Sequence, residues 1–335
     1  MRKKIFKYLF WVLVLSGVLA GVCVFSFAFG TVNIPLNKII EIIFKDRGSS
    51  ECAILLNIRL PRILLGMAIG GALSLSGVIL QAMFRNPLVE PYSLGISGGA
   101  ALGVCLNIVF GLYRQWSMLT LPLFGFLGAV MVITLVYLLS IRMKILKIQT
   151  LLLIGVMISF ICSSLIMLIM SICHTEDLHG IIFWIMGSLE EPNWFLIKLT
   201  LIASILGLVI SYLFCFDLNA LTLGEEEAQH LGINIERTKR LLFILTSLLT
   251  GCSVSVAGII GFVGLVVPHF VRLFIGQDHR ILLISSFLSG AIFLITCDTL
   301  ARTVISPLEL PVGVITGILG GGLFLYAIIS RKKTI

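Results

Sequence analysis

Long apolar runs separated by short polar segments dominate the pattern of this chain. Several of the runs reach about 18 residues or more, and about 20 helical residues cross the hydrocarbon core of a bilayer. Glycines and Pro268 interrupt the pattern in the seventh and eighth of these runs. We predict an all-α polytopic membrane protein with ten transmembrane helices, at about 6–29, 60–84, 93–111, 118–140, 149–172, 193–215, 241–258, 260–276, 281–301 and 312–330.

The distribution of lysine and arginine predicts the direction of these spans. Ten spans put both termini on one side, and if that side is cytoplasmic, sixteen of the 24 Lys and Arg residues lie inside. Cytoplasmic loops are normally enriched in these residues. The sequence therefore predicts a multi-pass protein of the bacterial cytoplasmic (inner) membrane, with both termini in the cytoplasm.

Composition supports the membrane assignment and excludes several other classes. The chain is 59% hydrophobic and 12% charged, with a net charge of +8 and a mean hydropathy of +1.13. The basic residues gather at span ends next to membrane lipid, so we expect no nucleic-acid partner. The eight cysteines show no C-x-x-C and no metal-ligand spacing, so we expect no metal site and no cofactor. Cys52 and Cys173 both fall in outer segments, and their pairing stays open.

Two glycine-rich segments suggest that the second half of the chain repeats the first. GGALSLSGVILQAMFRNP (70–87) and GCSVSVAGIIGFVGLVVP (251–268) share five identical residues at a constant offset of 181, including Gly77 with Gly258. The segments belong to the second and seventh spans, which cross the membrane in opposite directions. This pattern predicts an inverted repeat within one domain (1–335), with a first half at about 1–172 and a second at about 193–335.

Three arginines on the predicted outer side oppose the general charge bias. Arg59 and Arg62 follow a long outer loop (30–58), in which Asn33 to Phe44 is predicted to form a short surface helix. Arg302 ends the ninth span. One interpretation is that the three arginines bind a partner or ligand. The alternative is that they extend to lipid headgroups or pair within the chain, as Arg302 would with Asp298 one helical turn earlier.

One long polar segment, 217–240, lies on the predicted cytoplasmic side. Within it, LGEEEAQHLG is typical of a two-turn helix with three glutamates at its dipole-positive start and Gly232 as its C-terminal cap. Ala228 and Leu231 would give it a small apolar face. Because a free helix of this length is unstable in water, we expect the chain or a partner to hold it; the alternative is a solvated acidic loop.

Five motifs occur in order from about residue 55 to the C-terminus. They are RLPR, GGALSLSGVILQAMFRNPLVEPYSLGISGGAALG, LGEEEAQHLGI, GFVGLVVPHFVR and ELPVGVITGILGGGLF. These motifs resemble the FecCD-type permeases of binding-protein-dependent ABC importers for iron-siderophores, haem and cobalamin. The resemblance implies a type II importer homodimer with two ATPase subunits below and a periplasmic or lipid-anchored binding protein above.

The resemblance implies roles for three groups of residues. The outer arginines would dock the binding protein, and they are Arg59, Arg62 and Arg302. The segment 224–232 would be the coupling helix that contacts the ATPase, through Gly224, Glu225, Glu226, Glu227, Ala228, Leu231 and Gly232. A pathway or gate region would comprise Gly258, Gly261, Gly264 and Pro268, together with the turn at Asn86 and Pro87.

The sequence contains no phosphate-binding G-x-x-x-x-G-K-[ST] motif, so ATP hydrolysis would belong to a partner. We expect a transport subunit without catalytic residues, with an iron(III)-siderophore as cargo and haem or cobalamin as alternatives. An ion-coupled secondary transporter is less favoured, because Asp298 lies near the outer end of its span. An intramembrane enzyme would need a catalytic motif such as H-E-x-x-H, which is lacking. Whether the outer His174 and His179 contact cargo stays open.

Overall fold

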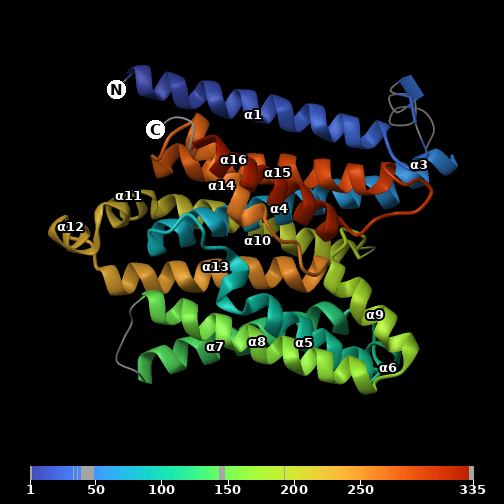
Figure 1. Ribbon diagram of the computed structural model, residues 1–335. Coiled ribbons are helices and arrows are strands. Elements are labelled where there is room, and N and C mark those ends of the chain that lie inside the picture. Colours follow the sequence, from blue (N-terminus) through green and yellow to red (C-terminus); the bar gives the residue numbers. More distant parts are fainter. Residues whose placement is uncertain are drawn as a thin grey trace.

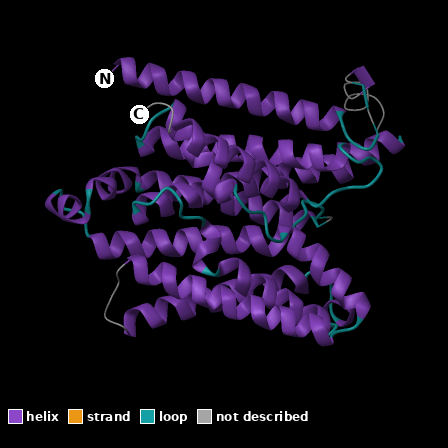
Figure 2. Ribbon diagram, viewed as in Figure 1, coloured by secondary structure: helices purple, strands orange, loops and turns teal. Residues whose placement is uncertain are grey.

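The computed structural model describes residues 2–32, 34–35, 37–38, 49–142, 148–191 and 193–331. Within these ranges the chain forms helices and loops, without strands (Figure 2). Ten helices correspond one for one to the ten predicted spans, within a few residues at most ends. They are α1 (Arg2–Ala28), α4 (Leu60–Phe84), α5 (Ile96–Val109), α7 (Thr120–Arg142), α8 (Ile148–Ile172), α10 (Trp194–Leu213), α13 (Ile235–Ala257), α14 (Val263–Phe274), α15 (His279–Thr303) and α16 (Val312–Arg331).

Seven of these helical segments are long and apolar enough to cross a membrane, whereas the apolar parts of α5, α14 and α16 are shorter. Shorter elements join the spans: α3 (Ser50–Ile54), a π-helical segment (Leu55–Arg59), a 3-10 turn (Pro91–Leu94), α6 (Leu112–Gln115), α9 (Thr175–Met186), α11 (Cys215–Leu223) and α12 (Glu225–His230). The predicted surface helix from Asn33 to Phe44 lies mostly outside the described residues.

Both termini lie at one end of the bundle, together with α11, α12, the end of α7 and the start of α8 (Figure 1). We call this end the terminal side. The segments α3, α6 and α9 lie at the opposite end, which we call the far side. The polar segment 217–240 and the three arginines of the sequence analysis therefore lie at opposite ends of the molecule.

Side-chain caps begin several of the spans. The side-chain oxygens of Asn193, Asn234 and Asp278 accept hydrogen bonds from backbone N–H groups in the first turns of α10, α13 and α15, at 2.9, 3.0 and 3.1 Å. Each bond satisfies a backbone donor that the helix itself leaves without a partner. These polar residues therefore fix where the apolar segments begin.

The two halves repeat one order of helices. A long helix, a short helix and two long helices follow one another as α4–α5–α7–α8 and again as α13–α14–α15–α16. Corresponding helices run in opposite directions between the two ends of the bundle (Figure 1). In both halves a left-handed residue ends the first long helix, Arg85 with φ 47° and Gly258 with φ 71°. The predicted inverted repeat is confirmed.

The predicted residue register of this repeat is wrong. The offset of 181 pairs Gly77 with Gly258, but Gly77 lies in the middle of α4 whereas Gly258 ends α13. The helix breaks instead pair Arg85 with Gly258. The shared small residues mark places where helices pack closely, and such places recur in many registers of a membrane bundle.

Helix α4 lies at the centre of the bundle, with most of its residues buried. Gly70 and Gly290 bring α4 and α15 into backbone contact, because a Cβ atom at either glycine would collide with the carbonyl oxygen of the other. Gly77 packs in the same way on the carbonyl of Gly264 in α14. Lipid offers no hydrophobic drive for helix association, so close backbone packing of this kind holds the centre together.

Candidate functional site

Arg59 is enclosed by the chain at the far side. It ends the π-helical segment before α4, is 2% exposed, and donates hydrogen bonds to the backbone carbonyl oxygens of Phe27 and Val32. These carbonyls lie at and just beyond the end of α1, where helix termini leave acceptors without partners. Arg59 therefore fastens the end of α1 to the start of α4.

Arg62 contacts carboxylates from three separate segments. Its Nη2 atom lies 2.6 Å from Oε2 of Glu309 and 3.4 Å from Oε2 of Glu190, and its Nη1 atom lies 4.0 Å from Oδ1 of Asp298. Glu190 belongs to the α9–α10 connection, Asp298 to α15 and Glu309 to the α15–α16 connection. Arg62 itself is 5% exposed, so it joins three segments from within the bundle.

Arg302 extends this network towards α1. Its Nε atom donates to Oδ2 of Asp298 at 3.0 Å, and its Nη2 atom donates to Oγ of Ser26 at 2.9 Å. The pairing of Arg302 with Asp298, which the sequence left as an alternative, is confirmed. The exposed charges beside this cluster are carboxylates, since the side chains of Glu190 and Glu309 are 71% and 38% exposed. Docking of a binding protein at the arginines stays a prediction.

The helix predicted in 224–232 is present at the terminal side as α12. Gly232 has φ 84°, and the N–H groups of Gly232 and Ile233 donate to the carbonyls of Gln229 and Ala228 at 2.9 and 3.1 Å, which confirms the predicted cap. Of the predicted apolar face, Ala228 is fully buried, whereas Leu231, which follows the last helical turn, is 65% exposed and lines a depression with residues of α11. Contact of this face with a partner stays a prediction.

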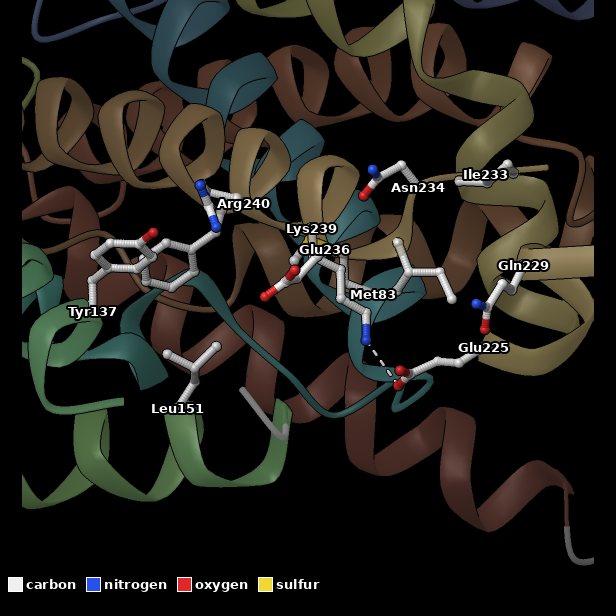
Figure 3. Close-up of a pocket in the computed structure, with 12 residues that line it drawn as sticks. Met83, Tyr137, Leu151, Glu225, Gln229, Ile233, Asn234, Glu236, Lys239 and Arg240 are labelled. Atoms are coloured by element: carbon white, nitrogen blue, oxygen red, sulfur yellow. Dashed lines mark ion pairs between the residues drawn. The ribbon is translucent and has the colours of Figure 1, made fainter. Parts of the chain in front are cut away.

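A pocket of about 490 Å³ separates α12 from the ends of α4, α7 and α8 (Figure 3). Glu225 and Lys239 form an ion pair of 2.8 Å at its edge, while Tyr137 and Leu151 lie on the opposite wall (Figure 3). The other lining residues are Met83, Gln229, Ile233, Asn234, Ile235, Glu236, Arg240 and Phe243. A second depression lies along α11 and the residues after α12, and it includes the exposed Phe216, Leu223 and Leu231. Helix α12 is thus a projecting acidic ridge with one recess between it and the bundle.

The break between α13 and α14 is held by two side chains that the sequence analysis missed. Oε1 of Glu90 accepts a hydrogen bond of 3.0 Å from the backbone N–H of Phe262, and the hydroxyl of Tyr92 accepts one of 3.1 Å from that of Ile260. Broken helices at membrane depth need such partners. The signal that was available is a carboxylate, Glu90, in a turn between two apolar spans.

The residues predicted for a gate region have different local roles. A Cβ atom at Gly258 would collide with the carbonyl of Trp184, and Gly264 packs against Pro91 and α4, whereas Gly261 has only Oε1 of Glu90 nearby, at 3.7 Å. Pro268 is buried inside α14. In the turn after α4, where Pro87 follows Asn86, Oδ1 of Asn86 accepts from the N–H of Leu88 at 2.9 Å. A pathway role for these residues stays a prediction.

Gln81, also missed from the sequence, joins the end of α4 to α14. Its Nε2 atom donates to the carbonyls of Gly264 at 3.2 Å and Val89 at 3.4 Å, while its Oε1 atom accepts from Nη1 of Arg272. One buried amide thus satisfies groups from two segments, α14 and the turn after α4. A glutamine among apolar residues near the end of α4 was the available signal.

The described residues contain no cluster of His, Cys, Asp or Glu that could hold a metal ion. Cys52 and Cys173 are both free thiols in this structure. On the far side, Nδ1 of His179 lies 2.9 Å from the carbonyl oxygen of Thr175, one turn earlier in α9, and the side chain of His174 does not cap that helix.

An inverted repeat of membrane helices with a break between α13 and α14 is typical of multi-pass transport proteins. The chain belongs to the FecCD transport family, whose sequence profile matches residues 18–330. It is therefore a permease of the ABC importer class.

Two relatives and one solved structure illustrate this membership. The hemin transport system permease protein HmuU of Yersinia pestis is 43% identical over 83% of this chain and 84% of its own length. The Fe(3+) dicitrate transport system permease protein FecD of Escherichia coli is 34% identical over 96% and 98%. A metal-chelate type ABC transporter solved in an inward-facing conformation superposes with a TM-score of 0.85 at 32% identity, covering 95% of this chain and 98% of its own.

Proposed function

We propose that this permease carries an iron(III) chelate of the siderophore type across the bacterial cytoplasmic membrane. In this proposal two copies of the chain form the pathway, two partner ATPase subunits supply the energy, and a periplasmic or lipid-anchored binding protein delivers the cargo. Membership of the FecCD family supports this assembly. The names of two relatives, which transport hemin and Fe(3+) dicitrate, support an iron-containing cargo.

The observation that carries the proposal is the projecting helix α12. Glu225, Glu226 and Glu227 are exposed on it, Ala228 anchors it to the bundle, and the helix projects from the bundle at the terminal side (Figure 1). An exposed acidic ridge is complementary to a basic cleft. We assign that cleft to the ATPase, so that closure of the ATPase dimer on ATP moves α12 and turns the pathway outward.

This assignment also proposes the orientation. The terminal side, which carries α12, would face the cytoplasm, where ATP and the ATPase are found. Both termini would then be cytoplasmic, in agreement with the excess of Lys and Arg in the segments predicted on that side of the membrane. The far side would face the binding protein; it carries Arg59, Arg62 and Arg302, which we call the arginine cluster.

For docking, we assign the direct contact to Arg62 and the exposed side chains of Glu190 and Glu309 beside it, which we call the rim around Arg62. A carboxylate of the binding protein would reach Arg62 by displacing Glu190, whose side chain is 71% exposed and lies 3.4 Å from the guanidinium. Arg59 and Arg302, which bind groups of α1, would hold the rim in shape. Because buried charges need partners, displacement of one carboxylate by another keeps Arg62 paired throughout.

Haem is the second candidate cargo, because the 43% identity to a hemin permease extends over most of both chains. The deciding experiment reconstitutes the permease in vesicles with its ATPase and the binding protein encoded beside it. Uptake and stimulated ATP hydrolysis are measured with a ferric siderophore, hemin and cobalamin. Response to the ferric siderophore alone supports the proposal; response to hemin alone supports the second candidate; transport without ATPase or binding protein overturns both.

The ATPase contact has its own test. Changing the three glutamates of α12 to lysine should abolish co-purification of the ATPase, since the partner cleft would then meet like charge. The matched control is Glu176→Lys, an 85% exposed glutamate on the far side, which should leave co-purification unchanged. Equal retention of the ATPase by both variants would remove α12 from the interface.

A further inference from the structure

Asp278, which precedes α15 at the terminal side, joins three parts of the molecule. Its carboxylate accepts hydrogen bonds from the hydroxyl of Tyr8 in α1 at 2.8 Å, from Nδ2 of Asn219 in α11 at 3.2 Å, and from Nη2 of Arg280 in α15 at 2.6 Å. The Arg280 guanidinium holds the pKa of Asp278 well below its usual range. The carboxylate is therefore ionised and accepts these bonds at any cytoplasmic pH.

Asn219 uses both ends of its amide at this junction. While Nδ2 donates to Asp278, Oδ1 accepts from the backbone N–H of His279 at 2.9 Å and lies 2.8 Å from Nδ1 of the same histidine. Asn219 thus binds the first turn of α15 from outside that helix. Helix α11, which carries Asn219, ends at Leu223, and only Gly224 separates it from α12, so this side chain links the proposed coupling helix to α15.

The opposite end of α15 carries the arginine cluster. Asp298 and Arg302 lie in its last two turns and bind Arg62 and Ser26 at the far side. Helix α15 runs from His279 to Thr303 without a proline or a break, so at 1.5 Å per residue it spans about 35 Å as one body. By contrast, α13 and α14 are separated by the break at 258–262.

Helix α1 is bound to α15 at both ends of this span. Tyr8 binds Asp278 at the terminal side, and Ser26 binds Arg302 at the far side. The two helices therefore move together, and α15 is also in backbone contact with α4 through Gly70 and Gly290. A displacement imposed on the first turn of α15 reaches the arginine cluster without passing through a flexible joint.

We propose that Asn219 is the positioning residue that transmits the movement of α11 and α12 to α15, and through α15 to the rim around Arg62. This inference rests on the proposed function of α12 as the ATPase contact. A second bond of α11, of 3.1 Å from Thr238 to Asp217, leads to α13, which carries none of Arg59, Arg62 and Arg302. Asn219 is thus the tie that leads into the helix that carries Asp298 and Arg302.

The test uses the complete complex, reconstituted in vesicles with ATPase and binding protein. In the Asn219→Ala variant we expect assembly and basal ATP hydrolysis to remain, while stimulation by the loaded binding protein and uptake of cargo fall by about tenfold. The control is Asn234→Ala, which removes an asparagine on the same side that bonds only to the N–H of Arg237 in its own helix. We expect this control to keep its stimulation.

A second pair of variants tests the positioning role of Asn219 if the complex that contains Asn219→Ala does not assemble. Asn219→Asp places two carboxylates face to face and should uncouple the complex. The double variant N219D/D278N exchanges donor and acceptor, so it should recover a measurable part of the stimulation lost in N219D. Such recovery is not expected from a side chain with a merely structural role.

Each result separates this inference from the proposed function. If the wild-type complex does not transport, the proposed function fails. If wild type transports and Asn219→Ala is stimulated equally, only the role of Asn219 fails. The role also fails if Asn234→Ala uncouples the complex as strongly, or if the double variant is no better than N219D.

Discussion

The guanidinium of Arg62 and the carboxylate of Glu309 lie 2.6 Å apart although 247 positions separate them in the chain. Asp298 and Glu190 contact the same guanidinium. The pairs belong to different environments, since Asp298 is 4% exposed and Glu309 carries a side chain that is 38% exposed. Arg62 therefore compensates one buried charge and tethers two surface segments at the same time.

Replacement of Arg62 should destabilise the protein far more than replacement of Glu309. Arg62→Met leaves Asp298 with Arg302 alone, and loss of one partner from a buried ionic cluster costs on the order of 3 kcal/mol. The side chain of Glu309 is already 38% exposed, so Glu309→Gln should cost less than about 1 kcal/mol. Thermal unfolding of the purified variants in detergent measures both.

The exposed ion pair between Lys38 and Glu51 is the control for this comparison. Lys38→Ala should shift the unfolding temperature no more than Glu309→Gln does, because solvated pairs contribute little. An Arg62→Met variant as stable as Lys38→Ala would contradict the role of Arg62 in compensating Asp298.

Gly77 should not tolerate a methyl group. A Cβ atom there would collide with the backbone carbonyl of Gly264, and a carbonyl in a packed helix cannot rotate away. We expect Gly77→Ala to cost about 1–3 kcal/mol or more, as overpacking of a core does, and to lower the yield of folded protein. Gly17→Ala is the matched control in α1, where a Cβ atom meets nothing within 4 Å; equal yields of the two variants would refute the packing argument.

Two glycines of the break between α13 and α14 should respond differently to the same substitution. Gly258 has φ 71°, and its Cβ atom would collide with the carbonyl of Trp184, so Gly258→Ala should lower both stability and uptake. Gly261 has neither restriction and should accept alanine with unchanged stability. Stability and uptake of both variants are to be measured. Loss of uptake in a stable Gly261→Ala protein would point to a direct role of this position in the pathway.

Both the oxygen and the nitrogen of the Gln81 amide should contribute to the stability of the protein. Gln81→Leu removes the acceptor of Arg272 and the donor to Gly264, and unsatisfied groups in a protein interior cost about 1–3 kcal/mol each. Gln81→Glu keeps an acceptor for Arg272 and should be less harmful. The unfolding temperatures of the two variants test this order, and a glutamate variant no more stable than the leucine variant would show that the acceptor for Arg272 contributes little.

The elements of the fold were predictable because hydrocarbon leaves the backbone few choices. Every N–H and C=O group within the bilayer must bond internally, so each long apolar run becomes a helix. The ten predicted spans, the helix α12 and the cap at Gly232 follow from such local rules. The register of the repeat did not follow, because small residues promote close packing in many alignments of two helices.

The roles of the charged and amide side chains were decided by the tertiary structure. From the sequence, Arg59 and Arg302 stood out as outer cations, yet both are enclosed by groups of α1. No role was predicted from the sequence for three side chains that join separate segments, Glu90, Asn219 and Gln81.

The sequence by itself determined the ten long apolar helices and α12, with most ends correct within a few residues, since hydropathy and capping act over a few neighbouring residues. The connecting helices α9 and α11 were not predicted. Only the tertiary structure decided which polar groups meet, such as Arg62 with Glu309 and Asn219 with Asp278. The physical reason is that a hydrogen bond or ion pair requires contact within a few ångströms. That contact depends on how all the helices pack together, which local patterns do not specify.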